Sequence, residues 1–168
     1  TNGTVIDGTG GPRRRADVAV RDDRIVGLGD LARAGAATVI DVVGKIVAPG
    51  FIDAHTHDDR LMLSAPEMAP KASQGVTTVV AGNCGVSLAP LVLGKRAVPP
   101  PLDLIGDPSW YRFSSFRSFV EELQAKPAAT NAVLLVGHTT LRVATMKNLD
   151  APASGAETSD RKSTRLNS

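Results

Sequence analysis

The stretch GFIDAHTHDD, residues 50–59, runs from a short apolar segment into two histidines that stand one residue apart. Side chains two apart on a strand point the same way, so Asp53, His55 and His57 are predicted to share one face, with Thr56 facing away. At the carboxyl end of a parallel barrel strand, such side chains line the mouth where chemistry occurs. Two imidazoles there can coordinate one divalent ion, but they do not complete its shell of about four ligands. A structural pair of surface or core histidines stays open as the alternative.

The segments after this stretch alternate between strand-like and helix-like patterns. Residues 65–75 (APEMAPKASQG) are helix-like and end at Gly75, and residues 76–85 (VTTVVAGNCG) are β-branched, which is typical of a buried parallel strand. A Pro-rich loop follows at residues 98–110. Residues 114–126 then form a predicted helix with an N-cap serine, and residues 131–138 (NAVLLVGH) are a further apolar strand. Strands that alternate with helices predict a parallel sheet covered by helices, in the α/β class.

The segments before this stretch have a different pattern. Residues 16–21 and 24–29 alternate apolar and polar side chains around Asp22 and Asp23, which predicts a β-hairpin with an acidic turn. Residues 37–50 continue with further short strands that end at Pro49 and Gly50. The first 47 residues are therefore expected to be a β-structure separate from the α/β part, which begins at residue 48.

Composition limits the classes of partner. The chain has 168 residues, 42% of them hydrophobic, and a net charge of +2, which fits one soluble globular core and selects no partner by charge. The short cluster of Arg13, Arg14 and Arg15 indicates a solvated turn, so no nucleic-acid, membrane or specific protein partner is predicted. The single cysteine cannot form an internal disulfide, which suits a reducing cytoplasm or a thiol that serves as a ligand.

Both ends of the chain predict a fragment. The sequence opens inside a strand-like segment without an initiator methionine, a signal-peptide pattern or a long apolar stretch. Its last nine residues, DRKSTRLNS at 160–168, can be read as a translation of GATCGGAAGAGCACACGTCTGAACTCC, which resembles a common sequencing-adaptor oligonucleotide. We therefore expect the biological sequence to stop near Ser159 and make no fold prediction for residues 160–168.

Four blocks of the sequence together resemble one family. The Asp-x-His-x-His stretch resembles the end of the first barrel strand in the amidohydrolase superfamily. Residues 5–30, 46–59, 73–91 and 136–142 agree in order and spacing with the N-terminal part of the D-aminoacylases, or N-acyl-D-amino-acid deacylases. The resemblance covers nearly all of residues 1–150. It implies a partial TIM-type (β/α) barrel of the metal-dependent hydrolases at residues 48–159, preceded at residues 1–47 by part of a small β-sandwich domain.

The resemblance gives the single cysteine a role. In that family the thiol of the GNCG block ligates zinc, and here it is Cys84; apart from the resemblance, a lone cysteine is more often a small buried hydrophobe. A thiolate is a good zinc ligand, and glycines on both sides allow a tight turn. The implied metal ligands are therefore His55, His57 and Cys84. His138, in the block GHTTLR, is either a substrate-pocket or supporting residue or a structural histidine at a strand end. Asp58 and Asp59 are expected to be loop acids or helix N-terminal charges.

The implied activity is zinc-dependent hydrolysis of the amide bond of N-acyl-D-amino acids to a carboxylate and a D-amino acid. The family's general-base aspartate and two further zinc-ligating histidines would lie beyond this chain, so no catalytic base is assigned within it and the chain alone is expected to be inactive.

Two alternatives remain at this stage. A dihydropyrimidinase-like cyclic amidase shares the opening strands and the His-x-His pair, but it has no need of a cysteine here. A truncated product without enzymatic function is the other, since a partial barrel leaves its sheet edges open.

Overall fold

The computed structural model describes the backbone of residues 1–166 and the side chains of residues 1–162. The chain divides into two compact units, Thr1–Pro49 and Gly50–Ser168, and each is described by itself. Residues 167 and 168 of the predicted adaptor tail lie outside the described residues. No helix in the part of the chain described here has the length and apolar character that crossing a bilayer requires.

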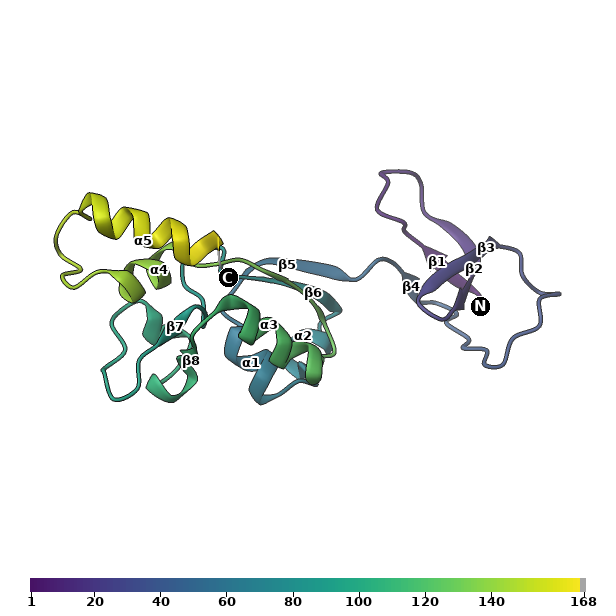
Figure 1. The fold of residues 1–168 in the computed structure, drawn as a ribbon. Coiled ribbons are helices and arrows are strands. Elements are labelled where there is room, and N and C mark those ends of the chain that lie inside the picture. Colours follow the sequence, from purple (N-terminus) through teal and green to yellow (C-terminus); the bar gives the residue numbers. More distant parts are fainter. Residues whose placement is uncertain (167–168) are drawn as a thin grey trace. The chain divides into compact units, whose positions relative to one another are not determined.

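The first unit is a four-stranded sheet with the order β3-β2-β1-β4 (Figure 1). Its strands are β1 (Gly3–Val5), β2 (Arg14–Arg21), β3 (Arg24–Gly29) and β4 (Ile46–Val47). The pair β2–β3 is antiparallel, and Asp22 sits in the turn with φ +54°, so the predicted hairpin is confirmed. The further strands predicted over residues 37–50 reduce to the two residues of β4, which pair in parallel with β1.

The second unit is built on a parallel three-stranded sheet with the order β5-β6-β9. Its strands are β5 (Phe51–Thr56), β6 (Val76–Ala81) and β9 (Asn131–Leu134). Helices α1 (Asp59–Ser64), α2 (Ala69–Ala72) and α3 (Phe116–Ala125) connect them along the chain. The predicted alternation of parallel strands and helices is confirmed, and the fold is mixed α/β.

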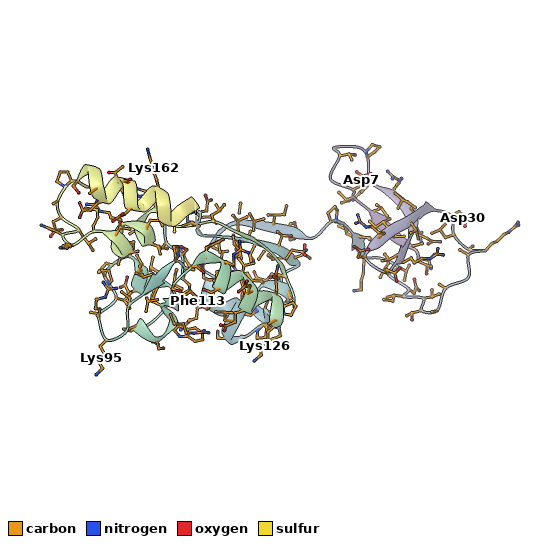
Figure 2. The ribbon with its side chains drawn as sticks, in the orientation of Figure 1. Asp7, Asp30, Lys95, Phe113, Lys126 and Lys162 are labelled. Atoms are coloured by element: carbon orange, nitrogen blue, oxygen red, sulfur yellow. The ribbon has the colours of Figure 1, made fainter. Side chains whose placement is uncertain are left out.

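The core of the second unit lies between the sheet and these helices. Val79 of β6, Met62 of α1 and Phe119 of α3 are all at most 1% exposed and belong to one buried cluster. Phe113 lies within the unit in Figure 2, whereas Lys95 and Lys126 point outward from it. At about 1.5–3 kcal/mol for each large apolar side chain, this cluster is the main stabilising term of the unit.

Several elements differ from the sequence prediction. The helix expected over residues 65–75 is limited to α2, because Met68 has a left-handed backbone (φ +49°) and a proline lies in the first turn; Gly75 (φ +78°) does close the segment. The Pro-rich loop contains two short 3-10 turns, Leu102–Leu104 and Pro108–Trp110, and is flanked by the paired strands β7 (Leu91–Val92) and β8 (Arg112–Phe113). The strand expected over residues 131–138 stops at Leu134.

Two helices follow that the sequence patterns did not predict. Helix α4 spans His138–Thr145 and helix α5 spans Gly155–Leu166, so α5 includes part of the segment for which no fold was predicted. The serine cap of α3 is as expected: Ser115 accepts a hydrogen bond from the Ser118 N–H at 3.1 Å.

Candidate metal centre

The candidate site forms where two parallel strands end side by side. Strand β5 pairs in parallel with β6, with Thr56 opposite Ala81, so both strands end at the same edge of the sheet. His55 and His57 lie at the end of β5, and Cys84 lies in the turn just after β6. This alignment brings together side chains that are 27 residues apart in sequence.

The three side chains converge. One ligand atom from each of His55, His57 and Cys84 can be chosen so that all lie within 4.8 Å of one another. The Cys84 Sγ atom is 3.6 Å from both ring nitrogens of His57, and the two imidazole centroids are 5.8 Å apart. The predicted convergence of these three groups is therefore confirmed.

The donor set fits a zinc ion. With Zn–N bonds of about 2.0 Å and Zn–S bonds of about 2.3 Å, ligand atoms of a tetrahedral site lie about 3.4–3.8 Å apart. The 3.6 Å between Cys84 Sγ and the His57 ring nitrogens falls in this range, and all three ligand atoms lie within 4.8 Å of one another. His55 and Cys84 are exposed and His57 is half-buried, so the cluster opens to solvent. These three ligands alone do not complete the shell of about four that a zinc ion takes.

The turn that carries Cys84 depends on its glycines. Gly82 and Gly85 have φ values of +84° and +93°, in the left-handed region that favours glycine. The Asn83 side chain donates a hydrogen bond from Nδ2 to the Ala54 carbonyl at 2.9 Å, which joins the turn to β5. Asn83 therefore fixes the position of this turn relative to the end of β5.

Comparison of the sequence with known proteins shows the family to which the chain belongs. The pattern of the amidohydrolase family matches residues 38–161. The chain belongs to the amidohydrolase family. It is 57% identical over 154 residues to an N-acyl-D-aspartate deacylase of Alcaligenes xylosoxydans xylosoxydans, covering 92% of this chain and 30% of that protein.

Two solved structures are also similar to this amidohydrolase chain. A D-aminoacylase studied for its binuclear metal centre superimposes with a TM-score of 0.95 at 50% identity, covering 99% of this chain and 35% of that one. An N-acyl-D-glutamate deacylase from Bordetella bronchiseptica, complexed with zinc and a phosphonate mimic of the tetrahedral intermediate, gives a TM-score of 0.89 at 45% identity, covering 98% and 34%. The chain spans about a third of the length of these relatives.

A lysine contacts three residues of the segment that carries His55 and His57. Lys71 Nζ lies 2.6 Å from Asp53 Oδ2, 3.0 Å from Asp58 Oδ2 and 3.3 Å from Thr56 Oγ1. The hydrogen bond from Lys71 holds the pKa of Asp53 below its usual range. Burial lowers the pKa of Lys71, but its bonds to Asp53 and Asp58 outweigh that effect and raise it.

These contacts correct one part of the strand prediction. One ammonium group reaches both Asp53 and Thr56, so the prediction that these residues face opposite sides of β5 was wrong. The pairing register between β5 and β6 shifts between Asp53 and Thr56, and such an irregularity breaks the strict alternation of side chains. Asp53 therefore joins Lys71 and does not belong to the His–Cys cluster.

Asp59 has a role that the sequence did not indicate. It is the first residue of α1, as a helix N-terminal charge would be, but its side chain is buried at 1% exposure. Its Oδ1 atom accepts a hydrogen bond from the Leu88 N–H at 3.2 Å, and burial raises the pKa of its carboxyl to about 6. Asp59 thus ties the start of α1 to the segment that follows Cys84.

His138 lies outside the cluster of ligand atoms. It is the first residue of α4, its side chain is exposed, and its Nε2 atom is 3.1 Å from Arg161 Nη1. Arg161 belongs to the predicted adaptor tail, so this contact supports no functional role. The backbone of His138 does lie beside Gly85, the neighbour of Cys84.

Proposed function

We propose that this chain is the N-terminal part of a zinc-dependent hydrolase that cleaves N-acyl-D-amino acids into a carboxylate and a D-amino acid. The convergence of two imidazoles and one thiol at the open end of parallel strands carries the proposal. The similarity to deacylases of N-acyl-D-aspartate and N-acyl-D-glutamate supports the substrate class. The substrate in this proposal is a small molecule. We also propose a cytoplasmic location, because a free thiol stays reduced there.

In this proposal, residues 48–159 are the first β/α units of a TIM-type barrel. Val79 and Ala81 on β6 are buried, at 0% and 1% exposure, whereas Phe51 and Ile52 of the neighbouring β5 are 67% and 66% exposed. Such apolar exposure on the outer strands is expected of a sheet that continues with further strands. Residues 1–47 would be part of a small β-sandwich, and residues 160–168 a translated adaptor.

The residues of this chain would bind and orient the metal. His55 and His57 would each offer a neutral ring nitrogen, and Cys84 a thiolate, and all three are already close together. Bound there, zinc would polarise the acyl carbonyl and lower the pKa of a coordinated water molecule. Lys71 would keep the strand end that carries the histidines in place through its ion pairs with Asp53 and Asp58.

Proton transfer would be the task of a residue on a later strand, since the resemblance assigns the general base to an aspartate beyond this chain. The chain as given is therefore expected not to hydrolyse N-acyl-D-amino acids even with added zinc. Loss of several members of a catalytic unit is far from additive, so no partial activity is expected.

The test compares this chain with the complete protein that carries it. Both are supplied with matched N-acetyl-D- and N-acetyl-L-amino acids, with and without a chelator, and free amine is measured. Chelator-sensitive release of D-amino acid by the complete protein alone is the expected result. Release of D-amino acid by the short chain would refute the proposal that essential catalytic residues lie outside it. A complete protein that hydrolyses cyclic ureides and not N-acyl-D-amino acids would be a cyclic amidase.

A further inference from the structure

The thiol of Cys84 lies in an exposed turn, yet it is held near His57. A side chain in such a turn samples many positions unless the backbone on both sides is fixed, and metal affinity depends on that fixation. The upstream side is joined to β5 through the bond from Asn83 to Ala54. The downstream side is held by a different part of the chain.

The segment that follows Cys84 is buried and contains a polar residue, Ser87. Residues 86–90 are all buried, and Ser87 is 0% exposed. A buried serine needs partners for its hydroxyl and for both backbone groups, because a buried polar group without a partner destabilises the fold. All but one of those partners come from the start of α4, about fifty residues later in the sequence.

One hydroxyl group satisfies both backbone groups of Ser87. The Thr140 Oγ1 atom accepts a hydrogen bond from the Ser87 N–H at 2.8 Å and donates one to the Ser87 carbonyl at 2.9 Å. The Ser87 hydroxyl in turn accepts from the Gly137 N–H at 2.9 Å and donates to the Ala89 carbonyl at 2.6 Å. Thr140 is itself 0% exposed, so water does not compete for these bonds.

The same contact reaches the residue next to Cys84. The Gly85 carbonyl accepts a hydrogen bond from the Thr139 N–H at 2.8 Å, and so it pairs with an N–H group in the first turn of α4. Gly137 packs so closely that a Cβ atom there would lie 2.5 Å from the Gly85 oxygen. The backbone on the downstream side of Cys84 is thus fixed to α4 by hydrogen bonds and by direct packing.

We propose that Ser87 and Thr140 are positioning residues that set the Cys84 thiol in place for a metal shared with His55 and His57. This inference rests on the zinc site of the proposed function. Loss of the Thr140 hydroxyl would leave two buried backbone groups of Ser87 unpaired, and the segment would shift to find other partners. The thiol would move with it, while both histidines, which lie at the end of β5, would stay.

The test is made in the complete protein, with zinc affinity measured by chelator competition and with the thiolate-to-metal charge-transfer band of the Co²⁺-substituted protein. Thr140→Val removes the hydroxyl at nearly constant volume, and Thr140→Ser retains it. Thr145→Val is the matched control, because the Thr145 hydroxyl donates to the Leu141 carbonyl within the same helix. Cys84→Ala defines the signal without the thiol.

Thr140→Val is expected to weaken zinc binding by about 10- to 100-fold, the usual loss when a residue that supports a ligand is removed, and to weaken the charge-transfer band. Thr140→Ser and Thr145→Val are expected to stay within about twofold of the unchanged protein. If Thr140→Val does not fold, as judged by circular dichroism, Ser87→Ala replaces it, with the same loss expected.

The outcomes distinguish a failure of the positioning role from a failure of the proposed zinc site. Unchanged affinity and an unchanged band in a folded Thr140→Val variant, with both lost in Cys84→Ala, would overturn the positioning role alone. Affinity and a band that survive in Cys84→Ala would overturn the metal site itself and the positioning role with it. A loss in Thr145→Val equal to that in Thr140→Val would show a general weakening of α4, and it would also overturn the inference.

Discussion

Replacement of Gly82 by alanine tests how closely the end of β6 packs against the segment after β9. A Cβ atom at this position would lie 2.0 Å from the Leu135 carbonyl oxygen and 2.8 Å from its carbon, below the 3.0 Å that real Cβ atoms keep. The φ angle of +84° adds strain, since an L side chain in the left-handed region costs about 1–2 kcal/mol.

The magnitude follows from the two costs. To reach 3.0 Å, the two segments must separate by about 1 Å, which breaks the bond from the Leu135 N–H to the Ala81 carbonyl, now 3.0 Å long. An unmade buried bond costs about 1–3 kcal/mol, so Gly82→Ala is expected to lower the free energy of unfolding by about 2–5 kcal/mol in total.

Gly94 supplies the matched control. Its φ angle is +59°, but a Cβ atom added there would have no neighbour within 4 Å, so Gly94→Ala carries only the backbone cost of about 1–2 kcal/mol. Urea unfolding can be followed through Trp110, the single tryptophan, which packs against the core. Equal destabilisation by the two substitutions would refute the packing argument.

Three further predictions use other contacts. Lys71→Met leaves Asp53 and Asp58 without their cation and is expected to cost about 2 kcal/mol in urea unfolding, against about 0.5 kcal/mol or less for exposed Lys126→Met; equal costs would contradict the ion-pair account. Cys84→Ala in the complete protein is expected to lower zinc content and turnover together, and retention of both would show that the thiol only packs. Arg112 lowers the pKa of Glu122, so this half-exposed pair stabilises the fold above the unfolded pKa and loses that effect as pH falls. Glu122→Gln is accordingly expected to cost about 0.5 kcal/mol at pH 7 and progressively less as the pH falls and Glu122 takes up its proton, and a cost independent of pH would count against the pair.

Local patterns in the sequence were sufficient for the elements that place the candidate ligands. The apolar run before His55 and the β-branched run before Cys84 each predict a parallel strand, and parallel strands that pair must end at one edge. The cap at Ser115 and the turn at Asp22 were also predictable, because each depends on residues within four positions.

Other features depend on residues far apart in sequence. The hydroxyl pair of Ser87 and Thr140 joins positions 53 residues apart, and nothing in either local sequence indicates the partner. The local sequence around Asp59 is typical of a solvent-exposed acid, and its hydrogen bond with the Leu88 N–H is visible only in the folded structure. Asp53 and Thr56 reach the same ammonium group because the register between β5 and β6 is irregular there, which is a property of the strand pair and not of β5 alone.

The strand order β5-β6-β9 has a consequence for how the second unit assembles during synthesis. Spatial order and chain order coincide, so each strand that leaves the ribosome finds its partner already formed and adds to the exposed side of the growing sheet. No strand has to be inserted between two earlier ones, and each loop is closed before the next begins. The first pairing in this order already brings His55, His57 and Cys84 together, so the three can meet before β9 and α4 have formed, and α4 fixes the thiol only later.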